Sequence, residues 1–321
     1  MPIYDKRTLS KKAKELGFIR DTYEKMYRLT EILRFFNENE ELCSHFALKG
    51  GTAINLTIFN LPRLSVDIDL DFTKNYTRDK LMPIRSQLGE LLPRYMAAEG
   101  YIQSPKSKQT HALDSYVYSY TNAAGNNDNI KIEINYMLRS HLFEPEIVEV
   151  KAENVFLPFP VRSLAPMEIY ASKAIALTSR VAARDLYDFG NMVSLGLFDE
   201  SEKPMFRKCI LFYHAITGNS SGKEIQIENI NGITYHIIRT DLLPMIRGNE
   251  KFNLEETKKQ VMQYLSEMMI LEEQEKQFIQ YFSKGIYKPE LLFDDPEITE
   301  RIKSHPMAMW RTQRNKEESN R

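Results

Sequence analysis

Three aspartates alternate with apolar residues over residues 66–72, a short distance after a glycine pair at residues 50–51. Successive side chains of an extended segment point to opposite faces, so Asp67, Asp69 and Asp71 are expected to share one face. Carboxylates held side by side repel one another, and the usual reason to tolerate this is a divalent cation that neutralises them. The pattern therefore predicts a metal-binding strand around Asp67 and Asp69. We leave Asp71 out of the predicted metal site because it can equally end the strand.

The glycine pair predicts a turn where the backbone comes close to an anion. Gly50 and Gly51 carry no Cβ atom, so a phosphate can approach the chain there. A helix is expected over residues 52–59, with Thr52 capping its first turn, and the free amides at the start of such a helix attract the same anion. A glycine pair alone is more often an ordinary turn. The acidic strand that follows is what favours a triphosphate site.

Hydrophobic periodicity predicts the elements that position these residues. Apolar residues at helical spacing predict an amphipathic helix over residues 19–33, which should cover one face of a sheet. Residues 45–49 are expected to be extended. Residues 115–121 and 130–136 alternate in polarity on either side of a turn-forming segment, so they are predicted to pair as a hairpin.

After residue 160 the apolar spacing becomes helical and stays mostly so. One exception is residues 224–238, where alternating isoleucines surround Asn231-Gly232, a strong hairpin signal, and we predict a small hairpin there. Residues 311–321 are polar and charged, and we expect a frayed tail.

The composition restricts the class of protein. The 321 residues are 42% hydrophobic, and no run of about eighteen apolar residues could span a bilayer. Two distant cysteines, Cys43 and Cys209, exclude a disulfide framework, and together with the lack of a signal-like start they favour a cytoplasmic protein without membrane contact. The formal net charge of -1 means that a polyanion partner would need a local basic patch.

Five motifs in order resemble the AbiEii/AbiGii toxin family, a branch of the DNA polymerase β-like nucleotidyltransferase superfamily that includes MenT-like toxins. Several matches in the correct order are far more specific than one. The motifs occupy residues 49–53, 63–69, 131–135, 168–173 and 184–188.

The resemblance implies an α+β fold with a nucleotidyltransferase-type mixed β-sheet and flanking helices, followed by a mostly helical C-terminal domain. We place the nucleotidyltransferase core with its N-terminal helices at residues 1–160, an acceptor-binding helical domain at residues 161–310, and the tail at residues 311–321.

The resemblance also implies roles for individual residues, with Mg²⁺ or Mn²⁺ as cofactor and an NTP as substrate. The expected metal ligands are Asp67, Asp69 and Glu133. The expected catalytic residues are Asp67, Asp69, Glu133, Lys173 and Asp188. The expected nucleotide-binding residues are Lys49, Gly50, Gly51, Thr52, Arg63, Ser65, Lys173 and Asp185.

Each of these residues also has an ordinary structural interpretation. The aspartates can lie on a solvated edge strand, and the remaining candidates can be engaged in pairs, caps or solvent contact. These alternatives are a Glu133–Lys131 charge pair, a solvated Lys173, a helix cap by Asp185 and an Arg184–Asp188 ion pair. Two further residues, Arg180 and Arg184, form either a basic strip for RNA phosphates or ion pairs.

The resemblance implies transfer of a nucleoside monophosphate to a hydroxyl, with the tRNA 3′ end as acceptor, by the toxin of a type IV toxin–antitoxin or abortive-infection system. A cognate antitoxin encoded nearby would be its partner, with or without stable binding. It also implies that Ser65 can be phosphorylated by an antitoxin, which would place a dianion beside the metal carboxylates. Two alternatives stay open: a small-molecule, aminoglycoside-type nucleotidyltransferase, and a regulatory module that binds an NTP without transferring it.

Overall fold

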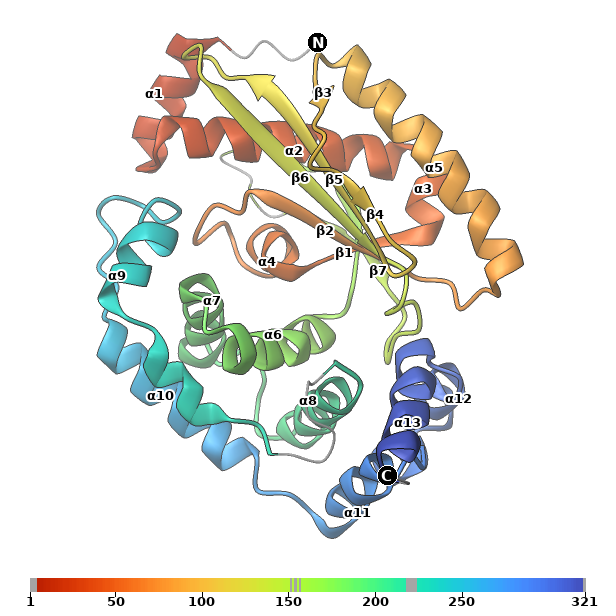
Figure 1. The fold of residues 1–321 in the computed structure, drawn as a ribbon. Coiled ribbons are helices and arrows are strands. Elements are labelled where there is room, and N and C mark those ends of the chain that lie inside the picture. The colour runs from red at the N-terminus through yellow and green to blue at the C-terminus, as the bar shows by residue number, and fades with distance from the viewer. Residues whose placement is uncertain (1–4, 151, 153–154, 156, 218–223, 320–321) are drawn as a thin grey trace. The chain divides into compact units, whose positions relative to one another are not determined.

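The computed structural model describes residues 5–150, 152, 155, 157–217 and 224–319 (Figure 1). By density of contacts the chain divides into two compact units. Unit 1 comprises Met1–Arg139, Pro145–Ser163 and Leu243–Glu250, and unit 2 comprises Ser140–Glu144, Leu164–Leu242 and Lys251–Arg321. The predicted domains, residues 1–160 and 161–310, stay a prediction, because contact density does not show which segments fold independently.

Unit 1 is built on a mixed sheet with flanking helices. Its helical elements are α1 (Lys6–Leu16), α2 (Arg20–Glu38), α3 (Glu40–His45), α4 (Gly50–Ala53), the π-helix η1 (Ile54–Ile58) and α5 (Arg78–Ala98). Its strands are β1 (Phe46–Lys49), β2 (Asp67–Phe72), β3 (Ile102–Gln103), β4 (Lys108–Gln109), β5 (Leu113–Thr121), β6 (Asn127–Asn135), β7 (Glu146–Glu149) and β8 (Pro160–Ser163).

The strands are ordered β3-β5-β6-β2-β1-β8-β7, with β4 also paired to β5. β2 lies parallel to β6 and antiparallel to β1, which places the acidic strand in the middle of the sheet. β5 and β6 pair antiparallel over their whole length, so the predicted hairpin is confirmed. The mixed sheet with its helices confirms the expected α+β core.

Helices cover one face of this sheet (Figure 1), and the side chains on that face are apolar and buried. Residues 68, 70 and 72 of β2 and residues 130, 132 and 134 of β6 are buried there. α2 covers this face, with Met26 and Leu29 fully buried, which confirms the amphipathic helix predicted over residues 19–33. The ring of Phe35 in α2 stacks on Tyr95 of α5 with 3.8 Å between centroids. Because side chains alternate, Asp67 and Asp69 project from the opposite face.

Unit 2 is mostly helical, as expected. Its elements are α6 (Pro166–Arg180), α7 (Ala183–Ser194), α8 (Lys203–Thr217), the 3₁₀-helix η2 (Ile227–Gly232), α9 (Tyr235–Ile237), the π-helix η3 (Ile238–Leu242), α10 (Leu254–Met268), α11 (Glu273–Ser283), the 3₁₀-helix η4 (Pro289–Leu291), α12 (Pro296–Ile302) and α13 (Pro306–Ser319). α6 packs against α7 and α8, and buried aromatic residues such as Tyr170, Phe189 and Phe206 fill the space among these helices.

The hairpin predicted over residues 224–238 is wrong. Residues 227–232 form the 3₁₀-helix η2 and residues 235–237 form α9. The isoleucines at positions 227, 230 and 233 recur every three residues, which is the 3₁₀ period, and Ile230 and Ile233 are fully buried. The Asn-Gly signal was therefore outweighed by burial of apolar side chains at a different spacing.

The frayed tail predicted over residues 311–321 is wrong as far as the structure describes it, because α13 continues to Ser319. Asn315 is buried, and its Nδ2 donates a hydrogen bond to the Phe282 carbonyl oxygen at 2.8 Å. Polar side chains can be buried at little cost when they are hydrogen-bonded. A polar composition was thus a poor guide to disorder here.

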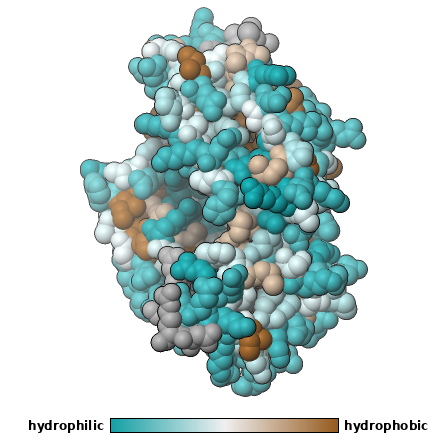
Figure 2. Space-filling model, turned by 45° about the vertical axis from the view of Figure 1, so that its right-hand side comes forward, coloured by the Kyte–Doolittle hydropathy of each residue, from teal (hydrophilic) through white to brown (hydrophobic). Residues whose placement is uncertain are grey.

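Figure 2 shows one face of the molecule, on which hydrophilic residues predominate and hydrophobic ones form small patches. Among the helices that the structure describes, none combines the length and apolar character needed to cross a bilayer.

Candidate active site

The glycine loop of unit 1 is packed directly against the acidic strand. Gly50 has a φ of 68°, a left-handed conformation that favours glycine. A Cβ atom added at this position would lie 2.6 Å from Asp69 Oδ2, which is closer than any real contact. Both the backbone conformation and the close approach therefore require glycine at position 50.

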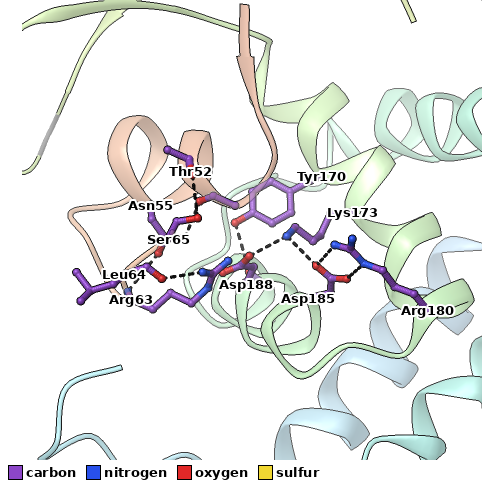
Figure 3. Close-up of polar contacts among 11 residues, drawn as sticks. Thr52, Asn55, Arg63, Leu64, Ser65, Tyr170, Lys173, Arg180, Asp185 and Asp188 are labelled. Atoms are coloured by element: carbon purple, nitrogen blue, oxygen red, sulfur yellow. Dashed lines mark hydrogen bonds and ion pairs between the residues drawn. The ribbon is translucent and has the colours of Figure 1, made fainter. Parts of the chain in front are cut away.

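The helix after this loop begins at Gly50, so the expected cap at Thr52 is wrong. Lys49 occupies the N-cap position, and Thr52 lies inside α4. The Thr52 hydroxyl is instead hydrogen-bonded to Ser65 Oγ at 2.8 Å and to the Asp67 carbonyl oxygen (Figure 3). Since Thr52 is fully buried, these bonds hold α4 against the start of the acidic strand.

The segment before β2 is also tied to the glycine loop. Arg63 is buried, and its Nη2 lies 2.6 Å from where a Cβ atom on Gly51 would stand. The same guanidinium donates from Nη1 to the Leu64 carbonyl oxygen at 2.9 Å. Asn55 is fully buried; it donates to the Gly51 carbonyl oxygen at 2.7 Å and accepts from the Arg63 backbone N–H at 3.2 Å.

Asn55 is a residue that the sequence interpretation missed. The available signal was a lone amide four residues after Gly51 within an apolar segment, a position where a side chain can reach the i−4 carbonyl.

The two predicted metal aspartates lie on a central strand beside the predicted third carboxylate. Asp69 of β2 and Glu133 of β6 are register partners in a parallel pair, and Asp67 is aligned with Lys131. Neighbouring strands lie about 4.8 Å apart, so these side chains are close neighbours on one face. The alternative of a solvated edge strand is wrong, since β2 is flanked by β1 and β6.

Glu133 forms the charge pair that was its structural alternative. Lys131 Nζ lies 2.8 Å from Glu133 Oε2, and both side chains are partly exposed. Within the described ranges, no three His, Cys, Asp or Glu side chains form a group that could hold a metal ion. Asp67, Asp69 and Glu133 are therefore neighbours with the right ligand chemistry, but they do not converge on one point.

Lys49, predicted to bind the nucleotide, is paired with Asp71. Its Nζ lies 2.6 Å from Asp71 Oδ1, and the Asp71 side chain is only 3% exposed. The third aspartate of the strand thus neutralises a lysine next to the glycine loop, in keeping with its omission from the predicted metal site.

In unit 2, a buried cluster joins α6 and α7 (Figure 3). Lys173 Nζ donates to Asp185 Oδ1 at 2.9 Å and to Asp188 Oδ2 at 2.8 Å. Its side chain is 5% exposed, so the solvated alternative for Lys173 is wrong. Asp185 lies within α7, whose N-cap residue is Ala182, so the capping alternative is wrong as well. The Tyr170 hydroxyl donates to the Asp188 backbone carbonyl oxygen at 3.3 Å.

Two cations hold the Asp185 carboxylate. In addition to Lys173, Arg180 donates to it from Nε at 2.6 Å and from Nη2 at 2.9 Å, although the Arg180 side chain is 64% exposed. Burial opposes ionisation of Asp185, but the charges and hydrogen bonds of Lys173 and Arg180 outweigh it and hold the pKa of Asp185 well below its usual value. Of the two roles considered for Arg180, the ion pair is the one observed.

The sequence was also compared with known families. A model described as the nucleotidyl transferase AbiEii toxin of type IV toxin–antitoxin systems matches residues 32–291, well over half of the chain. The chain belongs to this AbiEii family. The resemblance is confirmed, and so is the expectation of an enzyme: AbiEii proteins are nucleotidyltransferase toxins of type IV toxin–antitoxin systems.

The AbiEii fold assignment is supported by a solved structure. The chain is similar to MenT4, a nucleotidyltransferase toxin from Mycobacterium tuberculosis H37Rv, with a TM-score of 0.64 and 13% sequence identity over 96% of this chain and 99% of that chain. At this identity the likeness concerns the fold. A comparison with curated proteins gave no match.

Proposed function

We propose that this AbiEii protein uses Mg²⁺, or Mn²⁺ in its place, to transfer a nucleoside monophosphate from an NTP to the 3′ hydroxyl of tRNA. The observation that supports this most is the pairing of Asp69 with Glu133 beside Asp67, with Gly50 packed on the same aspartate. In the reaction the acceptor hydroxyl attacks the α-phosphorus and loses its proton to a base. The bond from this phosphorus to the oxygen bridging the α- and β-phosphates breaks, and pyrophosphate leaves with that oxygen.

The residues of unit 1 fit a divalent cation by their chemistry. Asp67 and Asp69 would hold it, because carboxylate oxygens are the ligands that Mg²⁺ prefers. When bound, the ion neutralises phosphate charge and favours ionisation of the attacking hydroxyl. Glu133 would complete a second metal site or accept the acceptor's proton, and its pair with Lys131 would first have to open.

The residues around the glycine loop would bind the nucleotide. Gly50 and Gly51 would bring Asp69 and Arg63 against the loop backbone, because these side chains occupy the places that Cβ atoms would take. The guanidinium of Arg63 and the hydroxyl of Ser65 lie beside Gly51, where both can donate to a phosphate oxygen. Thr52 would act through Ser65, and Lys49 would bind a phosphate once its pair with Asp71 opens.

For the residues of unit 2 we propose the roles that the family resemblance implies. Lys173 would act in catalysis and in nucleotide binding, as a point charge. Asp188 would act in catalysis and Asp185 in nucleotide binding; each accepts one hydrogen bond from the Lys173 ammonium.

The biological role that follows is growth arrest by modified tRNA, controlled by an antitoxin. An antitoxin that phosphorylates Ser65 would add a dianion next to Asp67, which would push this carboxylate out of place and repel the phosphates of an incoming nucleotide.

The deciding experiment incubates the purified protein with each labelled NTP, Mg²⁺ and total tRNA, and measures label on tRNA and release of pyrophosphate. We expect transfer by the wild type and a transfer rate at least about 100-fold lower in Asp69→Asn. The control is Asp294→Asn, which makes the same change at a side chain that is 82% exposed and should transfer at the wild-type rate. Label on an aminoglycoside instead of tRNA would favour the small-molecule alternative. Tight NTP binding without pyrophosphate release would favour the regulatory module.

A further inference from the structure

Unit 1 contains a pocket of about 810 Å³ between α5 and the turn that follows β4. Its lining includes three arginines, Arg78, Arg85 and Arg139, and one carboxylate, Glu90. The apolar part of the wall includes Met82, which is 44% exposed. The pocket is therefore mainly cationic, with an exposed apolar strip.

Arg85 shapes this pocket but is already neutralised. Its guanidinium is paired with Asp114, whose side chain is fully buried, with Nε 3.0 Å from Asp114 Oδ2. It also donates to the backbone carbonyl oxygens of Thr110 and His111. Since it is committed to these partners, Arg85 fixes the wall formed by the turn, and ligand charge must be met by other residues.

Arg78 and Arg139 are the cations that remain. In the part of the chain that the structure describes, neither forms an ion pair with a carboxylate. Arg139 donates from Nη1 to the Tyr136 carbonyl oxygen at 2.9 Å, but its Nε is inaccessible to solvent and has no hydrogen-bond acceptor among these residues. Burial lowers the pKa of Arg139, as expected for a charge removed from water without a counter-charge.

The Arg139 side chain is partly buried, and a guanidinium taken partly out of water without a counter-charge is costly unless an anion meets it. Arg139 therefore favours a ligand that brings negative charge to the pocket. Planar guanidinium groups match phosphate oxygens with two parallel hydrogen bonds, which favours phosphate as that ligand.

Two cations without a carboxylate partner among the described residues favour a chain of phosphates over a single one. Arg78 is the first residue of α5 and Arg139 follows β6, so the two reach the pocket from different elements and each can meet a phosphate. A nucleic acid strand presents successive charges only a few ångströms apart. Met82, which also lines the pocket, offers apolar surface to a ribose or base.

We propose that this pocket binds backbone phosphates of the RNA acceptor through Arg78 and Arg139. The proposal rests on the function proposed above, since it assigns a surface to the acceptor of that reaction. Arg78 and Arg139 act in binding only and take no part in phosphoryl transfer.

The test measures tRNA binding, without NTP, at several salt concentrations. It compares the wild type with Arg78→Gln/Arg139→Gln and with Arg7→Gln/Lys106→Gln, a control that removes two charges from exposed positions of the same unit outside the pocket. The pocket variant should bind tRNA at least about tenfold more weakly than the wild type. The slope of its log binding constant against log salt concentration, here called the salt slope, should be smaller in magnitude by about 1 to 2. The control should bind within about twofold of the wild type. Equal binding by the pocket variant and the control would overturn the proposal.

A single variant, Arg78→Gln, tests the proposal with a protein that should fold normally, because Arg78 is exposed. It should reduce the salt slope by about 1 without changing the melting temperature, and an unchanged slope would count against the pocket. If inorganic phosphate competes in the wild type while tRNA binds all variants equally, the site takes a free anion and the RNA assignment fails.

Transfer assays separate this proposal from the proposed function. The pocket variant should raise KM for tRNA and leave kcat unchanged at saturating tRNA, whereas Asp69→Asn should lower kcat. If both the pocket variant and the control transfer to tRNA with the same KM, the role of the pocket in RNA binding is refuted and the proposed function stands. No transfer by the wild type would refute the proposed function.

Discussion

Gly50 and Asp69 are in such close contact that any side chain at position 50 would displace the carboxylate. The glycine adopts a φ of 68°, and an added Cβ would stand 2.6 Å from Asp69 Oδ2. The loop and the acidic strand therefore behave as one unit, and a change in the loop should move a predicted metal ligand.

Gly50→Ala is expected to abolish transfer for this reason. The left-handed backbone costs an alanine about 1–2 kcal/mol, and the displaced Asp69 adds a loss of activity that strain alone does not explain. Gly100→Ala is the matched control, because Gly100 has a φ of 82° with nothing within 4 Å of its added Cβ. Thermal unfolding should show similar losses in both variants, and the labelled-NTP assay should show loss of transfer in Gly50→Ala alone. Normal transfer by Gly50→Ala would contradict the predicted role of Asp69.

The buried cluster of unit 2 gives a prediction about stability. Lys173→Met removes the ammonium shared by Asp185 and Asp188, both buried, and should lower the free energy of unfolding by about 3–5 kcal/mol. Arg180→Met removes the exposed partner and should cost about 1 kcal/mol or less. Urea denaturation measures both.

A triple variant separates the structural role of this cluster from its proposed catalytic role. Lys173→Met combined with Asp185→Asn and Asp188→Asn removes the buried charges together, so much of the lost stability should return. Transfer should remain absent if Lys173 acts on the phosphates. A triple variant that is stable and active would show that the cluster serves folding alone.

Acid should destabilise the protein partly through Asp185. Its pKa is depressed in the folded state, so the carboxylate contributes stability that is fully present above its unfolded pKa, near 3.9, and is lost as pH falls through the folded value. The free energy of unfolding of the wild type should therefore decline below about pH 4. Asp185→Asn should be less stable at neutral pH and decline less over the acidic range. Urea denaturation of the two proteins at a series of acidic pH values measures this. An equal decline of the free energy of unfolding in both would contradict the assignment to Asp185.

The elements with a clear period were predictable from the sequence, and the pairing of charges inside them was not. Alternation identified β2 and the β5–β6 hairpin because each side chain on one face is buried. Nothing local indicated that Lys173 is buried, since a lysine flanking an apolar helical stripe looks the same when it points to water. Its environment depends on Asp185 and Asp188, which come from another helix.

The failures have a similar cause. Lys131 lies two residues from Glu133 on the same strand, and the sequence pattern alone does not show whether the two side chains form an ion pair. In residues 224–238 the turn dipeptide suggested a hairpin, but the burial of Ile230 and Ile233 depends on the helices around them. Local signals predicted the elements, whereas tertiary contacts determined the hydrogen bonds of Thr52, the order in α13 and the pairing of each charge.

Ser65 gives a prediction about control of the enzyme. It is 6% exposed and hydrogen-bonded to Thr52, two residues before Asp67. A phosphate there carries a charge of about −1.5 to −2 and would break the Thr52 contact as well as repel the carboxylates. Ser65→Glu should therefore lose transfer. Ser65→Ala, which removes the hydrogen bond that the hydroxyl would donate to the nucleotide, should raise KM for the NTP and keep most of the transfer at saturating NTP.

The control for charge is Ser44→Glu, which adds the same charge at an exposed position of unit 1 and should remain active. After co-expression with the cognate antitoxin, the intact mass of the wild type should rise by one phosphate and that of Ser65→Ala should not. Phosphorylation of Ser65→Ala, or full transfer by Ser65→Glu, would place control elsewhere. Loss of transfer by Ser65→Ala at saturating NTP would contradict this account, and the melting temperature of the variant would show whether misfolding is the cause.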